Sequence, residues 1–328
     1  MNWSRNTGSP PTIITSKQMA NSPKIFVAGH KGMVGSAIVR KLESTGYSNL
    51  LTMSRSELDL SNQESVRVFF EKQRPDYVIV AAAKVGGIHA NNTFRADFIY
   101  ENLMIEANII HSAYLAGVQR LLFLGSSCIY PRDCAQPIKE EYLLTGPLEQ
   151  TNEPYAIAKI AGVKLCENYN RQYGTEYVSA MPTNLYGPND NYDLNNSHVL
   201  PALIRKAHEA KERGDRELVV WGSGKPMREF LYVDDMADAC VFLMESKVKD
   251  GLFNIGTGTD VTIQKLALIV SKIVGLDAEI RFDASKPDGT PRKLLSVDRM
   301  RALGWQAKTT LETGVALAYK SYLSKHVG

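Results

Sequence analysis

The feature that most constrains this chain is a short apolar run followed at once by three spaced glycines. Residues 24–28 read Lys-Ile-Phe-Val-Ala, and Gly29-His-Lys-Gly32-Met-Val-Gly35 comes next, ahead of an amphipathic stretch to about residue 46. Glycines let a backbone turn tightly and approach a pyrophosphate, and a helix amino end offers free N–H groups to the anion. A strand, a glycine turn and a helix in this order predict a dinucleotide-binding fold.

Apolar runs and helical stretches continue to alternate as far as residue 188. Strands are expected near 50–53, 77–82, 121–125 and 176–181, and helices near 62–74, 94–116 and 153–173. This alternation predicts an α/β fold with a doubly wound, Rossmann-like parallel sheet. Residues 24–188 would then form an NADP-binding domain.

The pattern loosens from residue 189. A polar loop to residue 198 is followed by an expected helix near 200–214, a strand and glycine turn near 218–224, and a helix near 262–274. We therefore predict that residues 189–328 form mainly a smaller α/β substrate-binding lobe, with some segments returning to the first domain. Residues 1–23, which are polar and contain no acid, predict a disordered tail.

Composition narrows the possible functions. With 44% apolar and 22% charged residues and a net charge of +3, the 328-residue chain is typical of a soluble globular protein. It has no long basic run that would indicate nucleic acid or membrane binding, and its apolar runs are far shorter than the ~20 residues that span a bilayer.

The cysteines bear on the compartment. Cys128, Cys134, Cys166 and Cys240 show no metal-ligand spacing and are too few for a disulfide scaffold, so we expect no metal site and a reducing, cytoplasmic location. The start of the chain lacks the apolar core of a secretory signal, although its lack of acids leaves an organelle transit peptide as the alternative.

The loop after the second expected strand indicates which nicotinamide cofactor binds. An NAD site usually carries an acid about twenty residues past the glycine turn, where it binds the ribose hydroxyls. Here the sequence reads Ser54-Arg55-Ser56. A guanidinium can pair with a 2′-phosphate, so Arg55 predicts NADP, with His30 and Lys31 adding to the pocket. The alternative is that Arg55 is a solvated loop charge.

Tyr155 and Lys159 form the first catalytic candidate. Residues four apart on a helix share a face, so the ammonium can lie beside the phenol and lower its pKa, making Tyr155 a proton donor near pH 7. The same spacing also occurs by chance on amphipathic helices.

The end of the run at 121–125 supplies the second set of candidates. Ser126 and Cys128 come at the carboxyl end of a buried strand, where ligands bind in open α/β sheets. A serine there can hydrogen-bond the same substrate oxygen as the phenol, and a deprotonated thiol can act as a base. The alternative for Cys128 is a small buried apolar residue.

Later residues suit a nucleotide-linked substrate. Trp221 offers a flat aromatic surface for a base, and Arg228 offers a guanidinium for a diphosphate. His198 ends the polar loop, where a lone histidine is often a solvated surface residue.

These motifs together resemble the extended short-chain dehydrogenase/reductases. More closely, Gly-His-Lys-Gly-Met-Val-Gly, Gly-Ser-Ser-Cys-Ile-Tyr-Pro, Pro-Thr-Asn-Leu-Tyr-Gly-Pro and Asn-Ser-His-Val-Leu-Pro resemble the GDP-L-fucose synthase family. The resemblance runs from about residue 24 to the end. It implies an NADPH-dependent enzyme, expected as a homodimer, that epimerises GDP-4-keto-6-deoxy-D-mannose at C3 and C5 and then reduces C4. One departure is Lys31, where arginine is common in that family.

The resemblance also implies roles for individual residues. The catalytic set would be Ser126, Tyr155 and Lys159 for reduction, with Cys128 as base and His198 as acid for epimerisation. The NADP-binding set would be Gly29, His30, Lys31, Gly32, Met33, Val34, Gly35, Arg55, Leu124, Gly125, Ser126, Ser127, Tyr155, Lys159, Pro182, Thr183, Asn184, Leu185 and His198. The substrate-binding set would be Ser126, Cys128, Lys206, Trp221, Arg228 and Asp288.

Two other functions were weighed against this one. A nucleotide-sugar 4-epimerase or 4,6-dehydratase of the same fold would favour an acid near position 55, and the dehydratases resemble Thr-Asp-Glu where this chain has Ser126-Ser127-Cys128. A non-catalytic NADP sensor could lose the Tyr155 and Lys159 pair without losing the fold, so the presence of that pair argues against it.

Overall fold

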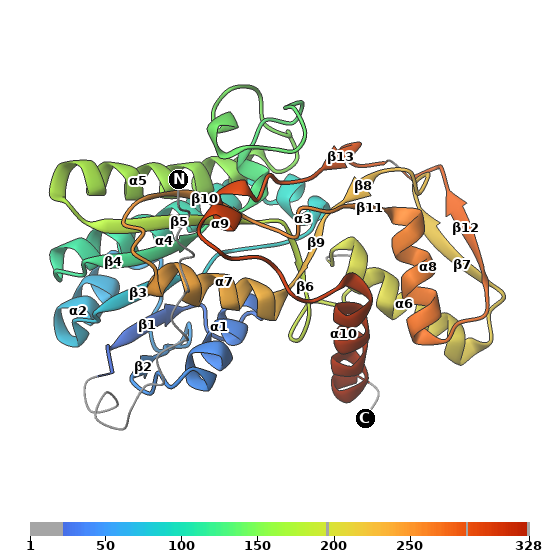
Figure 1. Cartoon of the computed structure of the whole chain (residues 1–328), viewed down its shortest axis with the longest axis horizontal. Helices are drawn as coiled ribbons and strands as arrows, with labels where there is room; N and C mark the ends of the chain where they lie inside the picture. The colour runs from blue at the N-terminus through green and yellow to red at the C-terminus, as the bar shows by residue number, and fades with distance from the viewer. Residues whose placement is uncertain (1–21, 195–196, 287, 327–328) are drawn as a thin grey trace, which may run out of the picture.

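A computed structural model describes residues 22–194, 197–286 and 288–326 of the chain. The predicted disordered tail, residues 1–23, lies almost wholly outside the described residues. Figure 1 shows a larger unit built on a six-stranded sheet beside a smaller unit of helices and short strands.

The six-stranded sheet is parallel throughout and confirms the predicted doubly wound fold. Its strands, in spatial order, are β10 (Gly251–Ile255), β5 (Glu176–Pro182), β4 (Arg120–Leu124), β3 (Tyr77–Val80), β1 (Ile25–Ala28) and β2 (Leu50–Leu51). The chain passes from β1 to β2 on one side and then returns to place β3 on the other. This reversal of direction beside β1 creates the crevice in which doubly wound folds bind ligands.

Helices cover both faces of the sheet because alternate side chains of each strand point to opposite sides. Phe26 and Ala28 of β1 pack with α2 (Gln63–Gln73), α4 (Arg95–Leu115) and α5 (Glu153–Tyr173). Ile25 and Val27 pack with α1 (Met33–Ser44), α7 (Val233–Glu245) and α9 (Asp298–Ala302). The continuous apolar runs of the sequence are therefore strands buried on both faces.

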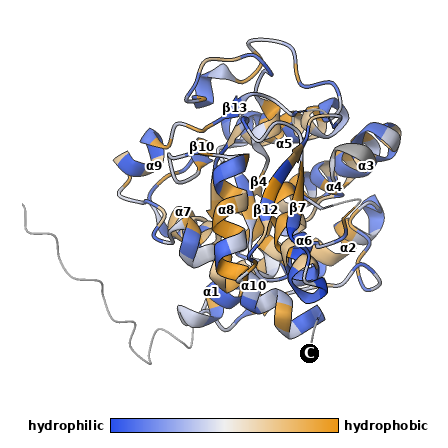
Figure 2. Ribbon diagram, turned by 90° about the vertical axis from the view of Figure 1, so that its right-hand side faces the viewer, coloured by the Kyte–Doolittle hydropathy of each residue, from blue (hydrophilic) through white to orange (hydrophobic). Residues whose placement is uncertain are grey.

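The smaller unit has a core of its own. It contains α6 (Val199–Arg213), α8 (Ile263–Val274) and α10 (Leu311–His326) with the parallel pair β7 (Glu217–Trp221) and β12 (Glu279–Asp283). Figure 2 shows hydrophobic residues concentrated where α8, β12 and β7 meet. The predicted helices near 200–214 and 262–274 are confirmed as α6 and α8.

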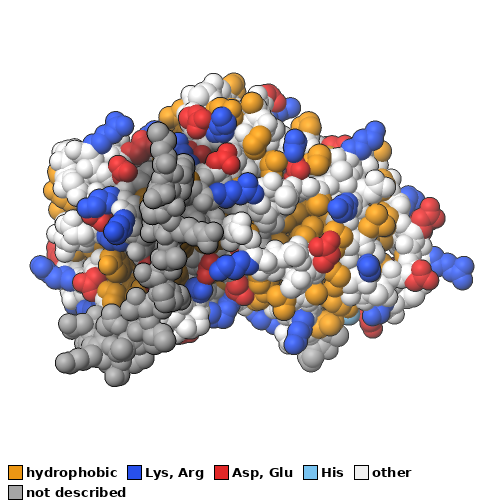
Figure 3. Space-filling model, viewed as in Figure 1, with side chains coloured by type: hydrophobic (Ala, Val, Ile, Leu, Met, Phe, Trp, Pro, Cys, Tyr) orange, Lys and Arg blue, Asp and Glu red, His pale blue; other side chains and the backbone are white. Residues whose placement is uncertain are grey.

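Short elements connect the two units. These are α3 (Ile88–Thr93), the single-turn helices η2 (Ser127–Ile129) and η3 (Glu140–Tyr142), the pair β6 (Asn184–Tyr186) and β9 (Phe230–Tyr232), and the three-stranded sheet of β11 (Val261–Thr262), β8 (Met227–Arg228) and β13 (Arg292–Lys293). Positive and negative side chains are interspersed over the face shown in Figure 3. Among the described helices, none is both long and apolar enough to cross a membrane.

Candidate active site

The glycine turn lies directly after β1, at the point where the strand order reverses. Gly29 has a φ of +86°, and the N–H of Gly32 donates to its carbonyl oxygen at 3.0 Å. A Cβ on Gly29 would lie 2.7 Å from the backbone nitrogen of Ala82, and one on Gly35 would lie 2.1 Å from the Gly29 oxygen. These two glycines are required by the packing of the turn itself.

Gly32 is different, because a Cβ there would meet its nearest neighbour, the Gly29 oxygen, only at 3.5 Å. Gly32 precedes the first turn of α1, which begins at Met33 and Val34 and contains neither an acid nor a side-chain cap. The N–H groups at this helix end therefore remain available to an anion, and the missing side chain leaves room for it. The turn fits the diphosphate of a dinucleotide.

Basic side chains lie around this turn. Lys31 is exposed, and the Nδ1 atom of His30 is buried with no hydrogen-bond partner among the described residues. Arg55 follows β2 with a side chain that is 80% exposed, and its Nη2 lies 3.6 Å from Glu101 Oε2. Its guanidinium is accessible to a phosphate.

Glu57 is an acid near this turn that the sequence analysis did not consider. Its carboxylate accepts from the N–H and hydroxyl of Ser54 at 2.7 and 2.6 Å. These bonds, with smaller effects of Lys31 and His30, hold the pKa of Glu57 below its ordinary value. The loop that contains Arg55 therefore also contains an acid, but the carboxylate of Glu57 is already hydrogen-bonded to Ser54.

The end of β4 places Ser126 and Cys128 at the carboxyl edge of the sheet. Ser126 is the N-cap of η2, and its hydroxyl accepts from the N–H of Cys128 at 3.4 Å. Burial raises the pKa of the Cys128 thiol, while Lys293, Ser126 and Lys159 each oppose that shift. Ser126 and Cys128 are both half-buried.

Tyr155 and Lys159 share one face of α5, whose first turn contains Glu153 and Pro154. The ammonium of Lys159 lies 5.8 Å from the centre of the Tyr155 ring. However, Lys159 donates to the Leu124 carbonyl at 3.1 Å and pairs with Glu106 at 2.8 Å, and both charged side chains are buried.

The pKa of Tyr155 in the structure is raised, whereas the predicted lowering counted on Lys159 together with a cationic cofactor ring. Burial raises the pKa of this phenol well above its ordinary value, and Cys128 and Glu106 add to the increase. The main physical reason is burial, which disfavours the charged phenolate, and the nearby Cys128 and Glu106 add smaller effects in the same direction. Glu106 was visible in the sequence only as an acid between the apolar residues Ile105 and Ile109 of the expected helix.

His198 is the N-cap of α6, and its exposed side chain makes no capping hydrogen bond. Partial desolvation and the ammonium of Lys293 lower the pKa of its imidazole. Lys293, on β13, therefore influences both His198 and Cys128, two residues that are far apart in the sequence. Lys293 was not among the residues predicted from the sequence.

The expected nucleotide-binding residues lie on the smaller unit. Trp221 ends β7 with 57% of its side chain exposed, and the ammonium of Lys206 lies 4.6 Å from its ring centre. Lys286, which the sequence analysis missed, lies 5.4 Å from the same ring. Arg228 donates to the Met227 carbonyl at 2.7 Å, and burial lowers its pKa although Asp288 opposes the shift.

Asp288 is held by the turn that follows β7. Its carboxylate accepts from the N–H and hydroxyl of Ser223 at 2.8 and 2.6 Å. A Cβ on Gly222, where φ is +82°, would lie 2.3 Å from an Asp288 oxygen. The predicted glycine turn near residues 222–224 therefore brings Asp288 close to Trp221.

The segment at Pro182–Leu185 lies where β5 ends and β6 begins. Its backbone and side chains are fixed by Glu229, whose carbonyl oxygen accepts from the Asn184 amide at 2.8 Å. The buried Glu229 carboxylate accepts from the N–H groups of Thr257, Gly258 and Leu295. Glu229 lies between β8 and β9, and the sequence analysis did not single it out.

Comparison with known proteins places this geometry in a family. The model of the NAD dependent epimerase/dehydratase family matches residues 25–256, from β1 to the end of β10. The chain belongs to the NAD dependent epimerase/dehydratase family. Lys286, Asp288 and Lys293 fall beyond the matched residues.

Several similar proteins are named GDP-L-fucose synthase. The chain is 56% identical over 322 residues to a putative GDP-L-fucose synthase 2 of Arabidopsis thaliana, covering 98% of each chain. It is 57% identical over 309 residues to the GDP-L-fucose synthase of Escherichia coli, covering 92% of this chain and 96% of the relative. A solved GDP-L-fucose synthetase of Naegleria fowleri bound to NADP matches with a TM-score of 0.88 at 29% identity, covering 99% and 98%. The resemblance read from the sequence is confirmed.

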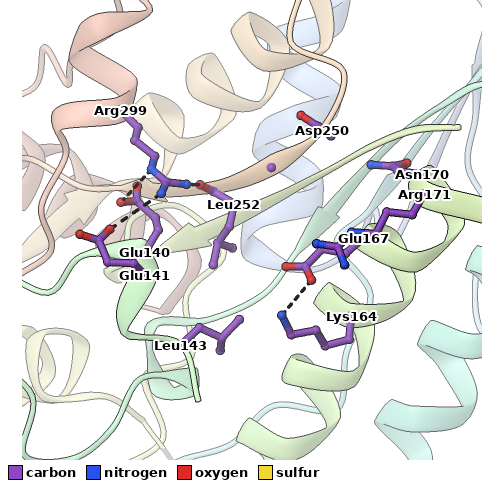
Figure 4. Close-up of a pocket in the computed structure, with 11 residues that line it drawn as sticks. Glu140, Glu141, Leu143, Lys164, Glu167, Asn170, Arg171, Asp250, Leu252 and Arg299 are labelled. Carbon is purple, nitrogen blue, oxygen red and sulfur yellow. Dashed lines mark hydrogen bonds and ion pairs between the residues drawn. The ribbon is translucent and has the colours of Figure 1, made fainter. Parts of the chain in front are cut away.

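A pocket of about 410 Å³ lies apart from the residues described above (Figure 4). It is lined by the second half of α5, the start of β10 and the side chains of Glu140, Glu141 and Arg299. Its charged groups pair with one another, as Lys164 does with Glu167 at 2.8 Å. Because it lies at the amino end of β10, the pocket is not part of the dinucleotide crevice.

Proposed function

We propose that this chain is an NADPH-dependent 3,5-epimerase/4-reductase that converts GDP-4-keto-6-deoxy-D-mannose to GDP-L-fucose. The observation that carries the proposal is that Lys293 acts on both the base candidate Cys128 and the acid candidate His198, in a chain that also has Ser126, Tyr155 and Lys159. A simple reductase needs only the last three residues. The relatives named GDP-L-fucose synthase support the same reaction.

One oxyanion site serves all three steps. C3 and C5 are both adjacent to the C4 ketone, so removing a proton from either carbon puts negative charge on the same oxygen. Ser126 and Tyr155 donate hydrogen bonds to that oxygen and stabilise the enolate. The Cys128 thiolate removes each proton, and His198 returns a proton from the opposite side of the sugar.

NADPH, when bound, would supply the hydride for C4, and Tyr155 would donate a proton to the C4 oxygen. The glycine turn and the free amino end of α1 hold the diphosphate of the cofactor, and Arg55 with Lys31 binds the 2′-phosphate. Ser127, the end of β4 and the segment at residues 182–185 support the nicotinamide half. Residues 24–188 form most of this cofactor-binding domain.

Residues 189–328 supply most of the substrate lobe. Trp221 stacks on the guanine base, Arg228 and Lys206 bind the diphosphate, and Asp288 orders the turn beside Trp221. Charge supports this assignment, because Lys206, Lys286 and Arg228 bring three cations to a site for a dianion.

The fold does not by itself exclude the 4-epimerases. A UDP-glucose 4-epimerase of Thermotoga maritima has a TM-score of 0.81 at 25% identity. Our choice rests on Cys128 and His198 at the site and on Arg55 near the cofactor, which the alternative reactions do not require.

We also propose that the chain forms a homodimer through α4 and α5. Several large apolar side chains are exposed on or just before these two adjacent helices: Phe94, Tyr100, Leu115, Ile157 and Tyr173. Such a pair of helix faces can pack against a second copy to form a four-helix bundle. The four free cysteines agree with the proposed cytoplasmic location.

Absorbance at 340 nm tests the function directly. The purified protein is mixed with NADPH and GDP-4-keto-6-deoxy-D-mannose, with NADH in a parallel reaction, and the sugar product is identified by NMR. We expect loss of NADPH absorbance with a fucose-configured product, and slower loss with NADH. Folded protein that binds NADPH but consumes none would refute the substrate assignment.

A further inference from the structure

Glu106 is an acid in the middle of α4 whose position the reaction described above does not use. Its side chain is 1% exposed, and its Oε1 atom lies 2.8 Å from the Lys159 ammonium. A Cβ on Gly162 of α5 would lie 2.8 Å from the other carboxylate oxygen. The missing side chain at Gly162 therefore lets the carboxylate fit between α4 and α5.

The carboxylate depends on Lys159 for its charge balance. Among the described residues, neither oxygen accepts a hydrogen bond of good geometry, and Lys159 is the cation that pairs with it. The ammonium also donates to the Leu124 carbonyl and lies 4.8 Å from the ring centre of Phe123 and 5.8 Å from that of Tyr155. Burial raises the pKa of the Glu106 carboxyl, and the Lys159 ammonium opposes that shift, so the negative charge of Glu106 depends on this pairing.

The titratable groups around Tyr155 come from several elements. Cys128 on η2 and Glu106 on α4 face the phenol, and Lys159 lies one turn along α5. Cys166 on α5 faces Glu106, and Lys293 on β13 faces Cys128. The closest pair in this cluster is Glu106 with Lys159. It removes the net positive charge that would otherwise favour the phenolate.

We propose that Glu106 is a positioning residue that neutralises Lys159 and so keeps Tyr155 a neutral hydrogen-bond donor throughout both epimerisations. This inference rests on the proposed function. Two successive enolates form at the C4 oxygen, and a phenolate would repel each of them, whereas a phenol stabilises them. The phenol then gives its proton to the C4 oxygen when hydride adds to C4, and the resulting phenolate regains a proton from water.

Titration of Tyr155 tests the proposal without substrate. Tyrosine labelled with ¹³C at Cζ is incorporated, and the Tyr155 resonance is assigned by its absence in Tyr155→Phe. We expect no titration of Tyr155 below pH 10 in the wild-type chain. In Glu106→Gln, we expect its acid dissociation constant to rise at least tenfold, because the charge of Lys159 is no longer balanced.

Glu167→Gln is the matched control. Glu167 pairs with Lys164 at the same 2.8 Å, but this pair is partly exposed and lies further along α5. The control should leave the Tyr155 titration unchanged. A wild-type Tyr155 that titrates near pH 7, or a Glu106→Gln variant with an unchanged titration, would overturn the proposal.

The pH dependence of turnover gives a second readout. The rate of C3 proton exchange in D₂O should fall at a lower pH in Glu106→Gln than in the wild type, and Glu106→Asp, which keeps the carboxylate, should resemble the wild type. If Glu106→Gln does not fold, the wild-type titration still decides. An active wild type with an ionised Tyr155 refutes only this inference, whereas a wild type with no turnover refutes the proposed function.

Discussion

At the scale of single residues, Cys128 shows how neighbouring groups adjust a thiol. Burial disfavours its thiolate, while Lys293, Ser126 and Lys159 favour it. A base needs the thiolate, so these three neighbours act in favour of proton removal. The hydroxyl of a serine at this position is a much weaker acid than the thiol, and the same three neighbours cannot ionise it.

Cys128→Ser should therefore lose C3 and C5 solvent-proton exchange by a factor of roughly 100 or more. The ¹H NMR signals of the substrate in D₂O measure this exchange, and NADPH binding and the unfolding temperature should stay near wild-type values. Cys134→Ser, at a half-buried cysteine six residues later, is the control and should exchange normally. Normal exchange in Cys128→Ser would remove the base from the mechanism.

A second residue, Asp190, links stability to pH. Its Oδ2 atom is buried without a hydrogen-bond partner among the described residues, and burial raises its pKa from 3.8 to about 7. Between pH 3.8 and about pH 7, the Asp190 carboxyl is protonated in the folded state but ionised in the unfolded state, so the folded state binds more protons. Its contribution to stability is therefore present below pH 4 and is lost as the pH rises through 7.

Asp190→Asn removes this loss, because the amide stays neutral at every pH. The variant should match the wild type near pH 4 and be more stable by about 1–3 kcal/mol at pH 8. Urea unfolding at several pH values measures the difference. Asp133→Asn, at a side chain that is 88% exposed, should show no such trend. A difference for Asp190→Asn that is constant across pH would contradict the linkage.

At the scale of elements, the three glycines of the turn between β1 and α1 have different roles. Gly29 and Gly35 are required by contacts within the turn, whereas a Cβ on Gly32, at the amino end of α1, would make only an ordinary 3.5 Å contact with the Gly29 oxygen. The same residue type is thus used for folding at two positions and for ligand access at the third.

Two alanine substitutions separate these tasks. Gly35→Ala should lower the free energy of unfolding by about 2–4 kcal/mol, because its Cβ overlaps the Gly29 carbonyl. Gly32→Ala should leave stability nearly unchanged but weaken NADPH binding by a factor of roughly ten or more, because the methyl group occupies space next to the phosphates. Thermal unfolding without ligand and fluorescence titration with NADPH measure the two effects. Equal loss of stability in both variants would show that Gly32 is also structural.

At the scale of the whole molecule, the two units meet at the carboxyl edge of the sheet. The larger unit provides the cofactor crevice and Cys128, and the smaller unit provides His198 and Trp221. The chain crosses between them several times, since β10 and α7 return to the larger unit after the smaller one has begun. The exposed apolar faces of α4 and α5 lie away from this junction.

Ile157→Arg tests the proposed dimer. Ile157 is 41% exposed on α5, and a buried arginine without a partner would oppose association of two copies. We expect a dimer for the wild type and a monomer for the variant in sedimentation equilibrium. Leu268→Arg, at a residue that is 56% exposed on α8, should leave the dimer intact. A monomeric wild-type chain, or a dimer that survives Ile157→Arg, would contradict this interface.

Much of the fold could be predicted because its signals are local. The apolar runs at β1, β3, β4 and β5 and the glycine turn each specify an element from a few neighbouring residues. Motif residues such as Ser126, Cys128 and Tyr155 follow from their positions at the ends of those elements. The place of β10 at the edge of the main sheet depends on its pairing with β5, which is distant in the sequence, and no local run specifies that pairing.

The sequence by itself determined the order of strands and helices, the cofactor turn and the identity of the motif residues, because periodicity and backbone freedom act over short distances. Only the tertiary structure decided the electrostatics of the site. The pairing of Glu106 with Lys159 and the approach of Lys293 to Cys128 and His198 join residues from different elements. The charge that Tyr155 experiences depends on these distances in a low-dielectric interior, and no local pattern encodes them.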